Sequence, residues 1–193
     1  ANLVGATRIG TVGRPLPGVG LRIVGDDGRA CAIDEIGQVQ VRGPNVFSGY
    51  WQMPEKTAEE FTADGWFKTG DVGRLDADGG LTLVGRSKDL IISGGFNVYP
   101  AEVEGLLNTL PGVAESAVIG LPHPDFGEAV VAVVTPRGTP DPAELIRALK
   151  DQIAGFKVPK RILVTPELPR NAMGKVQKNL LRQQYARLFS EPS

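Results

Sequence analysis

A lysine and an aspartate that each directly follow a glycine are the side chains of this sequence best suited to binding phosphate and sugar groups. Lys175 follows Gly174 at the end of a polar loop, just ahead of a predicted helix. A P-loop would need Gly at position 169 and Ser or Thr at 176, where the sequence has Pro169 and Val176. The start of a helix also disfavours a cation by about a few tenths of a kcal/mol. Lys175 is therefore either a solvated loop residue or a lysine with a role outside the P-loop pattern.

Asp71 closes a Lys-Thr-Gly-Asp segment that follows two aromatic residues. A carboxylate can accept hydrogen bonds from both hydroxyls of a ribose, although Thr-Gly-Asp is also a common turn. The segment Ser93–Gly95 lets the backbone approach a ligand closely, or makes a tight bend.

Basic residues gather in the C-terminal part of the chain, although the formal net charge is only −1. This local charge favours a site for a small anion over a nucleic-acid groove, and the alternative is a solvated helix face. The balanced total charge gives no attraction to nucleic acid either. Residues 157–187 hold one acidic residue, Glu167, and these basic ones: Lys157, Lys160, Arg161, Arg170, Lys175, Lys178, Arg182 and Arg187.

Cysteine and histidine each occur once, as Cys31 and His123. Disulfide frameworks, Cys-based zinc sites and multi-histidine metal sites are therefore excluded, and we predict no metal site. Cys31 is predicted to be structural and His123 to lie in a turn. No apolar run approaches the about 18 residues of a membrane span, and no signal peptide is visible, so we expect a cytoplasmic protein. The chain does not begin with Met, which suggests a piece of a longer protein.

The pattern of predicted helices and strands that must position these side chains changes near residue 86. Before it, strands are predicted at 21–24, 36–42, 73–75 and 81–84, with a short helix at 54–61. After it, helices alternate with strands at 117–119, 129–135 and 162–165. The helices begin at Pro100, at Pro142 after the N-cap Asp141, and at about residue 176. The predicted fold class is α/β (α+β), with a small α/β domain after residue 86.

Five stretches, taken together and in this order, resemble the adenylate-forming enzymes, the superfamily of acyl-CoA synthetases. The resemblance covers residues 9–185, and the segments Ile119–Glu128 and Phe96–Pro100 look closest to malonyl-CoA synthetases. The five stretches are Gly10–Gly18, Val41–Trp51, Gly65–Asp71, Val84–Pro100 and Leu168–Lys175.

The resemblance implies a domain organisation. Residues 1–86 would be the C-terminal end of the large AMP-binding domain, with short strands that form a small β subdomain. Residues 87–88 would be a hinge, and 89–193 a small mobile α/β lid domain. The family's Ser/Thr/Gly-rich phosphate loop and its Tyr-Gly-x-Thr-Glu motif do not occur in the sequence, so we expect the 193 residues alone to be inactive.

Enzymes of this family join a carboxylate to ATP with release of pyrophosphate, and then transfer the acyl group from acyl-AMP to the thiol of CoA. By resemblance, Asp71 holds the ribose hydroxyls and Arg86 contacts the nucleotide near the ribose and phosphate. Lys175 is the implied catalytic residue, because a cation at the α-phosphate stabilises the charge that develops during adenylation. Lys88 is the implied hinge residue, about which the lid turns between the two half-reactions.

The resemblance assigns a second group of residues to CoA. Gly94 and Gly95 match the strand that lines the pantetheine tunnel, where larger side chains would block the passage. Phe126 matches an aromatic position beside this tunnel. Lys157 and Lys160 are the expected partners of the CoA phosphates.

Malonate is the first substrate that the resemblance suggests, and methylmalonate and short fatty or aromatic acids are alternatives. ATP with Mg²⁺ and CoA are the implied co-substrates, and a lysine acetyltransferase acting on Lys175 is an implied partner, since acetylation removes the charge. A peptide-synthetase adenylation domain is a second interpretation, but such domains normally continue into a carrier domain. A non-catalytic module is a third, and the retention of Lys175, Asp71 and Arg86 argues against it.

Overall fold

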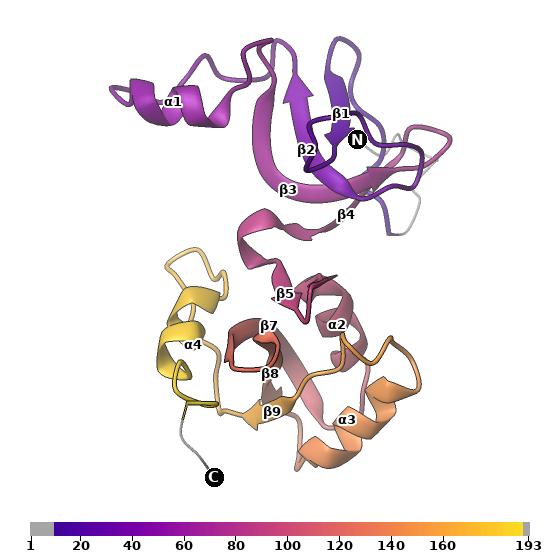
Figure 1. Ribbon diagram of the computed structural model, residues 1–193, viewed down its shortest axis with the longest axis vertical. Coiled ribbons are helices and arrows are strands. Elements are labelled where there is room, and N and C mark those ends of the chain that lie inside the picture. Colours follow the sequence, from indigo (N-terminus) through magenta and orange to yellow (C-terminus); the bar gives the residue numbers. More distant parts are fainter. Residues whose placement is uncertain (1–9, 191–193) are drawn as a thin grey trace. The chain divides into compact units, whose positions relative to one another are not determined.

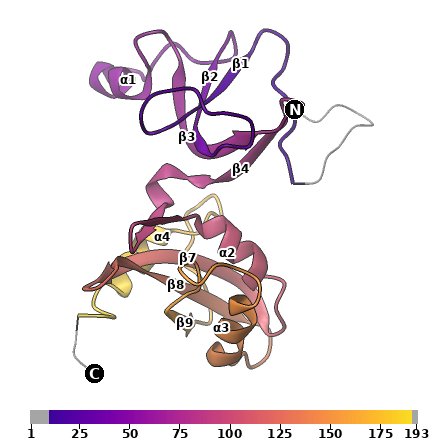
Figure 2. The same ribbon diagram turned by 45° about the vertical axis from the view of Figure 1, so that its right-hand side comes forward.

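The computed structural model describes residues 10–190, which divide into two compact units with the bounds Ala1–Lys88 and Asp89–Ser193 (Figures 1 and 2). Within residues 10–88, four strands form one antiparallel sheet in the order β1-β2-β3-β4, and helix α1 (Pro54–Glu60) connects β2 to β3. Alternating apolar residues on this sheet, Ile23, Val39 and Leu81, meet as its small core. The strands are β1 (Gly20–Val24), β2 (Gly37–Arg42), β3 (Phe67–Leu75) and β4 (Leu81–Arg86).

The hairpin between β3 and β4 turns at the Asp-rich segment 76–80, as the sequence predicts. Asp76 Oδ1 accepts hydrogen bonds from the backbone N–H groups of Asp78 and Gly80 at 2.9 and 2.8 Å. Gly79 has φ +76°, a conformation that glycine adopts without steric cost. The turn therefore fixes where β4 starts and sets the pairing of Leu75 with Leu81.

Cys31 lies between β1 and β2 and packs against the core of the first unit. Burial raises the pKa of its thiol, and the nearby carboxylates of Glu35 and Asp27 add to the effect.

The second unit is built on a mixed sheet. Within residues 89–190 its strand order is β6-β5-β8-β7, with β9 parallel to β8. The long hairpin of β7 and β8 is the centre of this sheet, and its residues pair from Val113↔Pro136 to His123↔Gly127. The strands are β5 (Ile91–Ser93), β6 (Phe96–Val98), β7 (Val113–His123), β8 (Gly127–Pro136) and β9 (Arg161–Val164), and the helices are α2 (Pro100–Leu107), α3 (Pro142–Lys150) and α4 (Lys178–Gln184).

Both faces of this sheet are buried. One set of alternating residues on β7 and β8, such as Val118 and Val130, packs with apolar residues of α2 and α3. The opposite set, such as Ile119 and Val131, packs with Leu181 of α4. Helices α2 and α3 therefore cover one face and α4 the other (Figure 1). Apolar runs such as 129–134 are continuous because the strand is covered on both sides.

The fold class α/β (α+β) is confirmed, and several details differ from the prediction. His123 does not lie in a turn: it ends β7, and its ring packs against Phe126 and Phe189 with centroids 4.7 and 4.9 Å away. The last helix starts at Lys178 and not near residue 176, and residues 185–190 continue as turns. The short strands β5 and β6 are not predicted by the sequence pattern. Each has three residues, too few for a recognisable alternation.

The turn before β3 gathers charged groups around Trp66. The guanidinium carbons of Arg22 and Arg42 lie 4.4 and 4.8 Å from the Trp66 ring centroid. Arg22 also donates from Nη1 to Asp64 Oδ2 at 2.9 Å. Hydrogen bonds from Thr62, and next from Arg22, lower the pKa of Asp64 from 3.8 to about 2.

We expect Asp64 to titrate near pH 2 in the folded protein. Because its pKa is lower in the folded than in the unfolded chain, its contribution to stability is complete above about pH 3.8 and is lost as the pH falls towards about 2. In a Thr62→Val variant the pKa of Asp64 should rise towards 3.8. An NMR titration of the Asp64 side-chain carboxyl measures both, with Arg22→Gln as the comparison for the second contribution. A wild-type midpoint near 3.8 would show that these hydrogen bonds do not form.

Candidate functional site

Asp71 and Arg86 face each other across strands β3 and β4. They are register partners, and Arg86 Nε donates to Asp71 Oδ1 at 2.8 Å. Directly opposed residues of an antiparallel pair project from the same face. The Asp71 side chain is 25% exposed and that of Arg86 is 52% exposed. The structure therefore presents a carboxylate and a guanidinium together at the surface of the first unit.

Hydrogen bonds of the side chain and carbonyl of Thr69 support this pair. Thr69 Oγ1 donates to the carbonyl of Val39 on β2 at 3.0 Å and accepts from the N–H of Asp71 at 3.1 Å. The carbonyl of Thr69 accepts from Arg86 Nη1 at 3.4 Å. Gly70, with φ +72°, makes the kink that allows these contacts. The Thr-Gly-Asp segment is thus a shaped part of β3, and not a connecting turn.

Lys88 lies in the short 3-10 helix η1 (Ser87–Asp89), directly after β4. The neighbouring Ser87 donates from Oγ to Gln38 Oε1 at 2.5 Å. Lys88 is also the last residue of the first unit.

Gly94 and Gly95 are the two central residues of the β5–β6 hairpin, so they lie in a turn and not within a strand. Their φ values are +58° and +82°, as type I′ turns require at both positions. The N–H of Gly94 donates to the carbonyl of Phe126 at 2.9 Å. This bond fixes the hairpin to the turn between β7 and β8.

Phe126 and Lys160 extend this site. A Cβ on Gly94 would lie 3.7 Å from the Phe126 ring, and Lys160 Nζ lies 4.6 Å from the centroid of the same ring. The structure thus brings together Gly94, Phe126 and Lys160 from three separate segments. Their arrangement offers backbone, an aromatic face and a cation to one ligand.

Lys157 has a different environment. Its Nζ donates to both carboxylate oxygens of Glu102 on α2, at 2.7 and 2.8 Å. Next to it, the rings of Phe156 and Phe96 stack with centroids 4.6 Å apart. Phe96 is 56% exposed. Sequence reasoning missed both Glu102 and this ring pair, because 55 residues separate Glu102 from Lys157.

Lys175 is exposed and ends a closed loop, which we call the lysine loop (residues 171–175). Arg170 and Val176 pair as a β-bridge at its base, and the N–H of Asn171 donates to the carbonyl of Lys175 at 2.9 Å. Because helix α4 begins only at Lys178, Lys175 lies outside its first turn. The predicted conflict between Lys175 and a helix dipole is therefore wrong.

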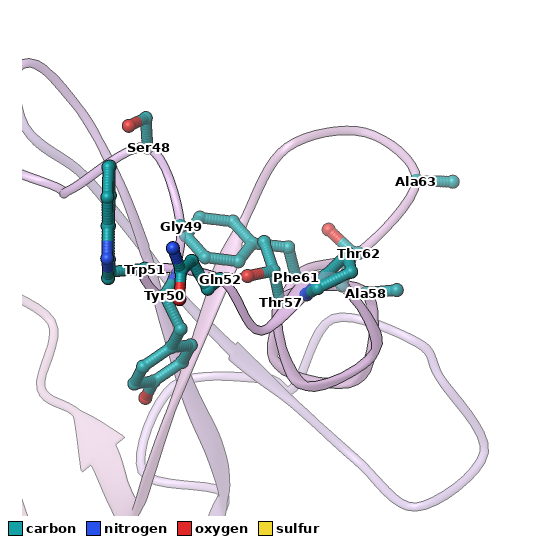
Figure 3. A pocket seen from close by; sticks show the side chains of 11 residues that line it. Ser48, Gly49, Tyr50, Trp51, Gln52, Thr57, Ala58, Phe61, Thr62 and Ala63 are labelled. Atoms are coloured by element: carbon teal, nitrogen blue, oxygen red, sulfur yellow. Dashed lines mark hydrogen bonds between the residues drawn. The ribbon is translucent and has the colours of Figure 1, made fainter.

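A separate cavity of about 760 Å³ opens on the first unit (Figure 3). It lies between the loop at 48–52, helix α1 and residues 61–63, so it contains none of the predicted site residues. Trp51, which lines it, is 86% exposed.

Among residues 10–190, no group of three His, Cys, Asp or Glu side chains could hold a metal ion. None of the helices in that range is long and apolar enough to cross a membrane.

Two family descriptions match parts of the chain. Residues 102–175 match the AMP-binding enzyme C-terminal domain, and residues 2–51 match the AMP-binding enzyme family. The first match contains Phe126, Lys157, Lys160 and Lys175.

Known proteins resemble the chain over nearly its whole length. Indoleacetate–CoA ligase of Aromatoleum aromaticum is 46% identical over 93% of this chain and 36% of that protein. Malonate–CoA ligase of Arabidopsis thaliana is 42% identical over 93% of this chain and 31% of that protein. The crystal structure of ATP-bound MatB from Rhodopseudomonas palustris is 51% identical, with a TM-score of 0.89, over 93% of this chain and 36% of that one. The chain thus spans about a third of the length of these relatives.

Proposed function

We propose, from the membership of this chain in the AMP-binding family of adenylate-forming enzymes, that the complete protein is an acyl-CoA ligase. In the first half-reaction a carboxylate oxygen attacks the α-phosphorus of ATP and pyrophosphate leaves. In the second, the CoA thiol attacks the acyl carbon, AMP leaves, and the thiol proton is released. The ion pair of Asp71 and Arg86 on neighbouring strands is the observation that carries the proposal.

The carboxylate of Asp71 suits the ribose of ATP. A carboxylate accepts about four hydrogen bonds, so the bond from Arg86 leaves capacity for two ribose hydroxyls. Arg86 at the same time orients the carboxylate, and its exposed guanidinium can reach a phosphate. A preformed pair of this kind binds a nucleotide without reorganising the strands.

An Asp71→Asn variant of the complete protein should raise the KM for ATP about 10- to 100-fold. The reason is that hydrogen bonds to a charged group contribute about 1.5–3 kcal/mol, and the amide offers one acceptor oxygen in place of two. Steady-state kinetics with varied ATP measures the effect, and Asp26→Asn, at an exposed turn of the first unit, is the matched control. An unchanged KM for ATP would remove Asp71 from the nucleotide site.

We propose that Lys175 is the catalytic cation of adenylation and that Lys88 is the hinge about which residues 89–193 move as a lid relative to the domain that ends at residue 86. An exposed loop supports the first role, because the lysine must reach the α-phosphate and then leave. Acetylation of Lys175 by a lysine acetyltransferase would remove the charge and so stop adenylation.

We propose that the site around Gly94, Gly95, Phe126 and Lys160 binds CoA. The open hairpin turn gives the pantetheine chain a passage, and Lys160 offers a charge to the phosphates. Lys157 is a weaker candidate because Glu102 already neutralises it.

Mg²⁺ would enter with ATP. The described residues offer no cluster of three metal-binding side chains, and Mg²⁺ in such sites keeps phosphate oxygens and water as ligands. The ion would screen the phosphate charge when bound.

The proposed use of ATP and CoA, together with a single cysteine in these 193 residues, favours a cytoplasmic location.

We propose malonate as the carboxylate. A malonate–CoA ligase is among the relatives at 42% identity, but an indoleacetate–CoA ligase reaches 46%, so identity over this region does not discriminate between substrates. The test is pyrophosphate release by the complete protein with malonate, methylmalonate, and short fatty and aromatic acids, each with and without CoA. Thioester and AMP formation that is fastest with malonate is expected. Adenylation without transfer to CoA would contradict the proposed CoA-ligase activity. Faster thioester formation with another acid would show that malonate is not the preferred substrate.

A further inference from the structure

Arg170 joins the lysine loop to the sheet of the second unit. Its Nη1 donates to the carbonyl of Gly174 at 2.6 Å. Its Nη2 forms an ion pair with Glu115 Oε2 on β7. One guanidinium therefore bridges the residue before Lys175 and a strand that is 55 residues away in sequence.

The loop is also closed from within. Asn171 Oδ1 accepts from the N–H groups of Met173 and Lys175, both at 3.0 Å. The N–H of Gly174 donates to the carbonyl of Asn171 at 2.9 Å, and Gly174 has φ +78°. These bonds shape the loop from within, and the bridge from the Arg170 side chain adds a direct connection between Gly174 and β7.

Glu115 is held in place by the sheet. The register of β7 shifts between Val113 and Glu115, so a bulge sets the direction of this side chain. The carbonyl of Glu115 accepts from Thr135 Oγ1 of β8 at 3.4 Å. The backbone of the residue that accepts from Arg170 is thus part of the sheet.

Two further ion pairs fix the segment that follows the loop. Lys178 Nζ lies 2.7 Å from Glu104 Oε1 of α2, and Arg182 Nη2 lies 2.9 Å from Asp89 Oδ1. These pairs hold helix α4. Of the three, only the pair of Arg170 and Glu115 includes a residue that bonds the lysine loop itself.

We propose that Arg170 and Glu115 are positioning residues that hold the lysine loop so that Lys175 is presented to the reacting groups. The inference rests on the catalytic role of Lys175 proposed above. A lysine side chain has many rotamers, so the position of its backbone decides where the ammonium can reach. A guanidinium donates in a fixed planar fork, and it can therefore set the distance between the Gly174 carbonyl and β7.

The experiment measures each half-reaction of the complete protein under single-turnover conditions. The variants are Arg170→Gln, Glu115→Gln, Arg170→Lys and Lys175→Ala, and the double variant Arg170→Gln/Lys175→Ala. Arg137→Gln, at an exposed position just after β8, is the matched control. Thermal unfolding of each variant reports on folding.

We expect Arg170→Gln to slow adenylation about tenfold, within the roughly 10² that a 1 Å misplacement of a reacting group can cost. Glu115→Gln should slow it less, because the bond from Arg170 to Gly174 remains. Arg170→Lys should fall between wild type and Arg170→Gln, because an ammonium lacks the fork. The KM for ATP and the formation of thioester from preformed acyl-AMP should stay within about twofold. In the Lys175→Ala background, loss of Arg170 should cause no further slowing, because a positioning residue acts only through the group that it positions.

Equal slowing by Arg170→Gln with and without Lys175 would overturn the inference in favour of a general structural role. Normal adenylation by Arg170→Gln, together with slow adenylation by Lys175→Ala, would overturn this inference alone. If Lys175→Ala adenylates normally, the proposed role of Lys175 fails first and this inference fails with it. If Arg170→Gln does not fold, Glu115→Gln alone and combined with Lys175→Ala gives the same comparison.

Discussion

A Lys175→Ala variant of the complete protein should adenylate its carboxylate roughly 10²–10³-fold more slowly than wild type. The estimate follows from the loss of one preorganised group that stabilises developing charge, about 2.7–4 kcal/mol in barrier height. Thioester formation from preformed acyl-AMP and CoA should proceed at a near-normal rate, because the proposed lid motion would carry Lys175 away from the reacting thiol before this step. Single-turnover kinetics of each half-reaction measures both rates.

Lys150→Ala is the matched control for this experiment. Lys150 is the last residue of α3 and is exposed, so its removal takes away one surface charge without touching the lysine loop. It should leave both half-reactions unchanged. If the Lys175→Ala enzyme adenylates as fast as this control, Lys175 has no catalytic role and is a solvated loop residue.

The pairing of Asp71 with Arg86 shows which features of a site a sequence pattern predicts and which it does not. The hairpin is predictable from its turn residues, and the turn sets the register of Leu75 with Leu81. Continued without interruption, this register would place Asp71 opposite Gly85. A bulge between the pairs Gly73–Leu83 and Val72–Gly85, with Val84 of β4 as the extra residue, shifts the register by one and brings Asp71 opposite Arg86. Bulges carry no strong local signal, so both residues are found from the sequence while their ion pair is not.

The lysine loop illustrates a second limit. The sequence predicts a helix from about residue 176, whereas the bridge of Arg170 with Val176 and the bond from the N–H of Gln177 to the carbonyl of Pro169 delay the start of the helix. These backbone bonds connect residues that are only a few positions apart, and they form only when Arg170 and Val176 lie side by side. Its partner Glu115 lies on another element, and only the assembled sheet brings the two together.

Packing of the second unit was easier to predict than its contacts. The spacing of Val103, Leu106, Leu107 and Leu110 indicates the buried face of the helical segment that contains α2. Val103 and Leu107 are fully buried, and Leu106 and Leu110 are partly buried against the same core. The capping of α3 is also confirmed, because Asp141 Oδ1 accepts from the N–H of Ala143 at 2.8 Å. Periodicity reports which side of an element is covered. It does not report which polar groups from distant elements meet at the edges, and the candidate site consists of such groups.

A Gly95→Trp variant should spare adenylation and slow thioester formation by roughly 10², the cost of displacing a reacting group by about 1 Å. A Cβ at Gly95 would meet no atom within 4 Å, so a side chain there points into open space and not into the unit. If this space is the passage of the pantetheine chain, an indole ring would obstruct CoA without disturbing the core. The φ of +82° adds a strain of about 1–2 kcal/mol for a residue other than glycine.

Two further variants separate obstruction from strain. Gly95→Asn tolerates the left-handed conformation better than other residues and has a small side chain, so it should retain most of the thioester rate. Gly79→Trp places the same ring at φ +76° with open space around it, in the β3–β4 hairpin, and should lower the thermal stability while leaving both half-reactions intact. The decisive quantity is the ratio of the two half-reaction rates in each variant. If Gly95→Trp slows both half-reactions equally, the hairpin glycine serves folding, and the CoA passage must lie elsewhere.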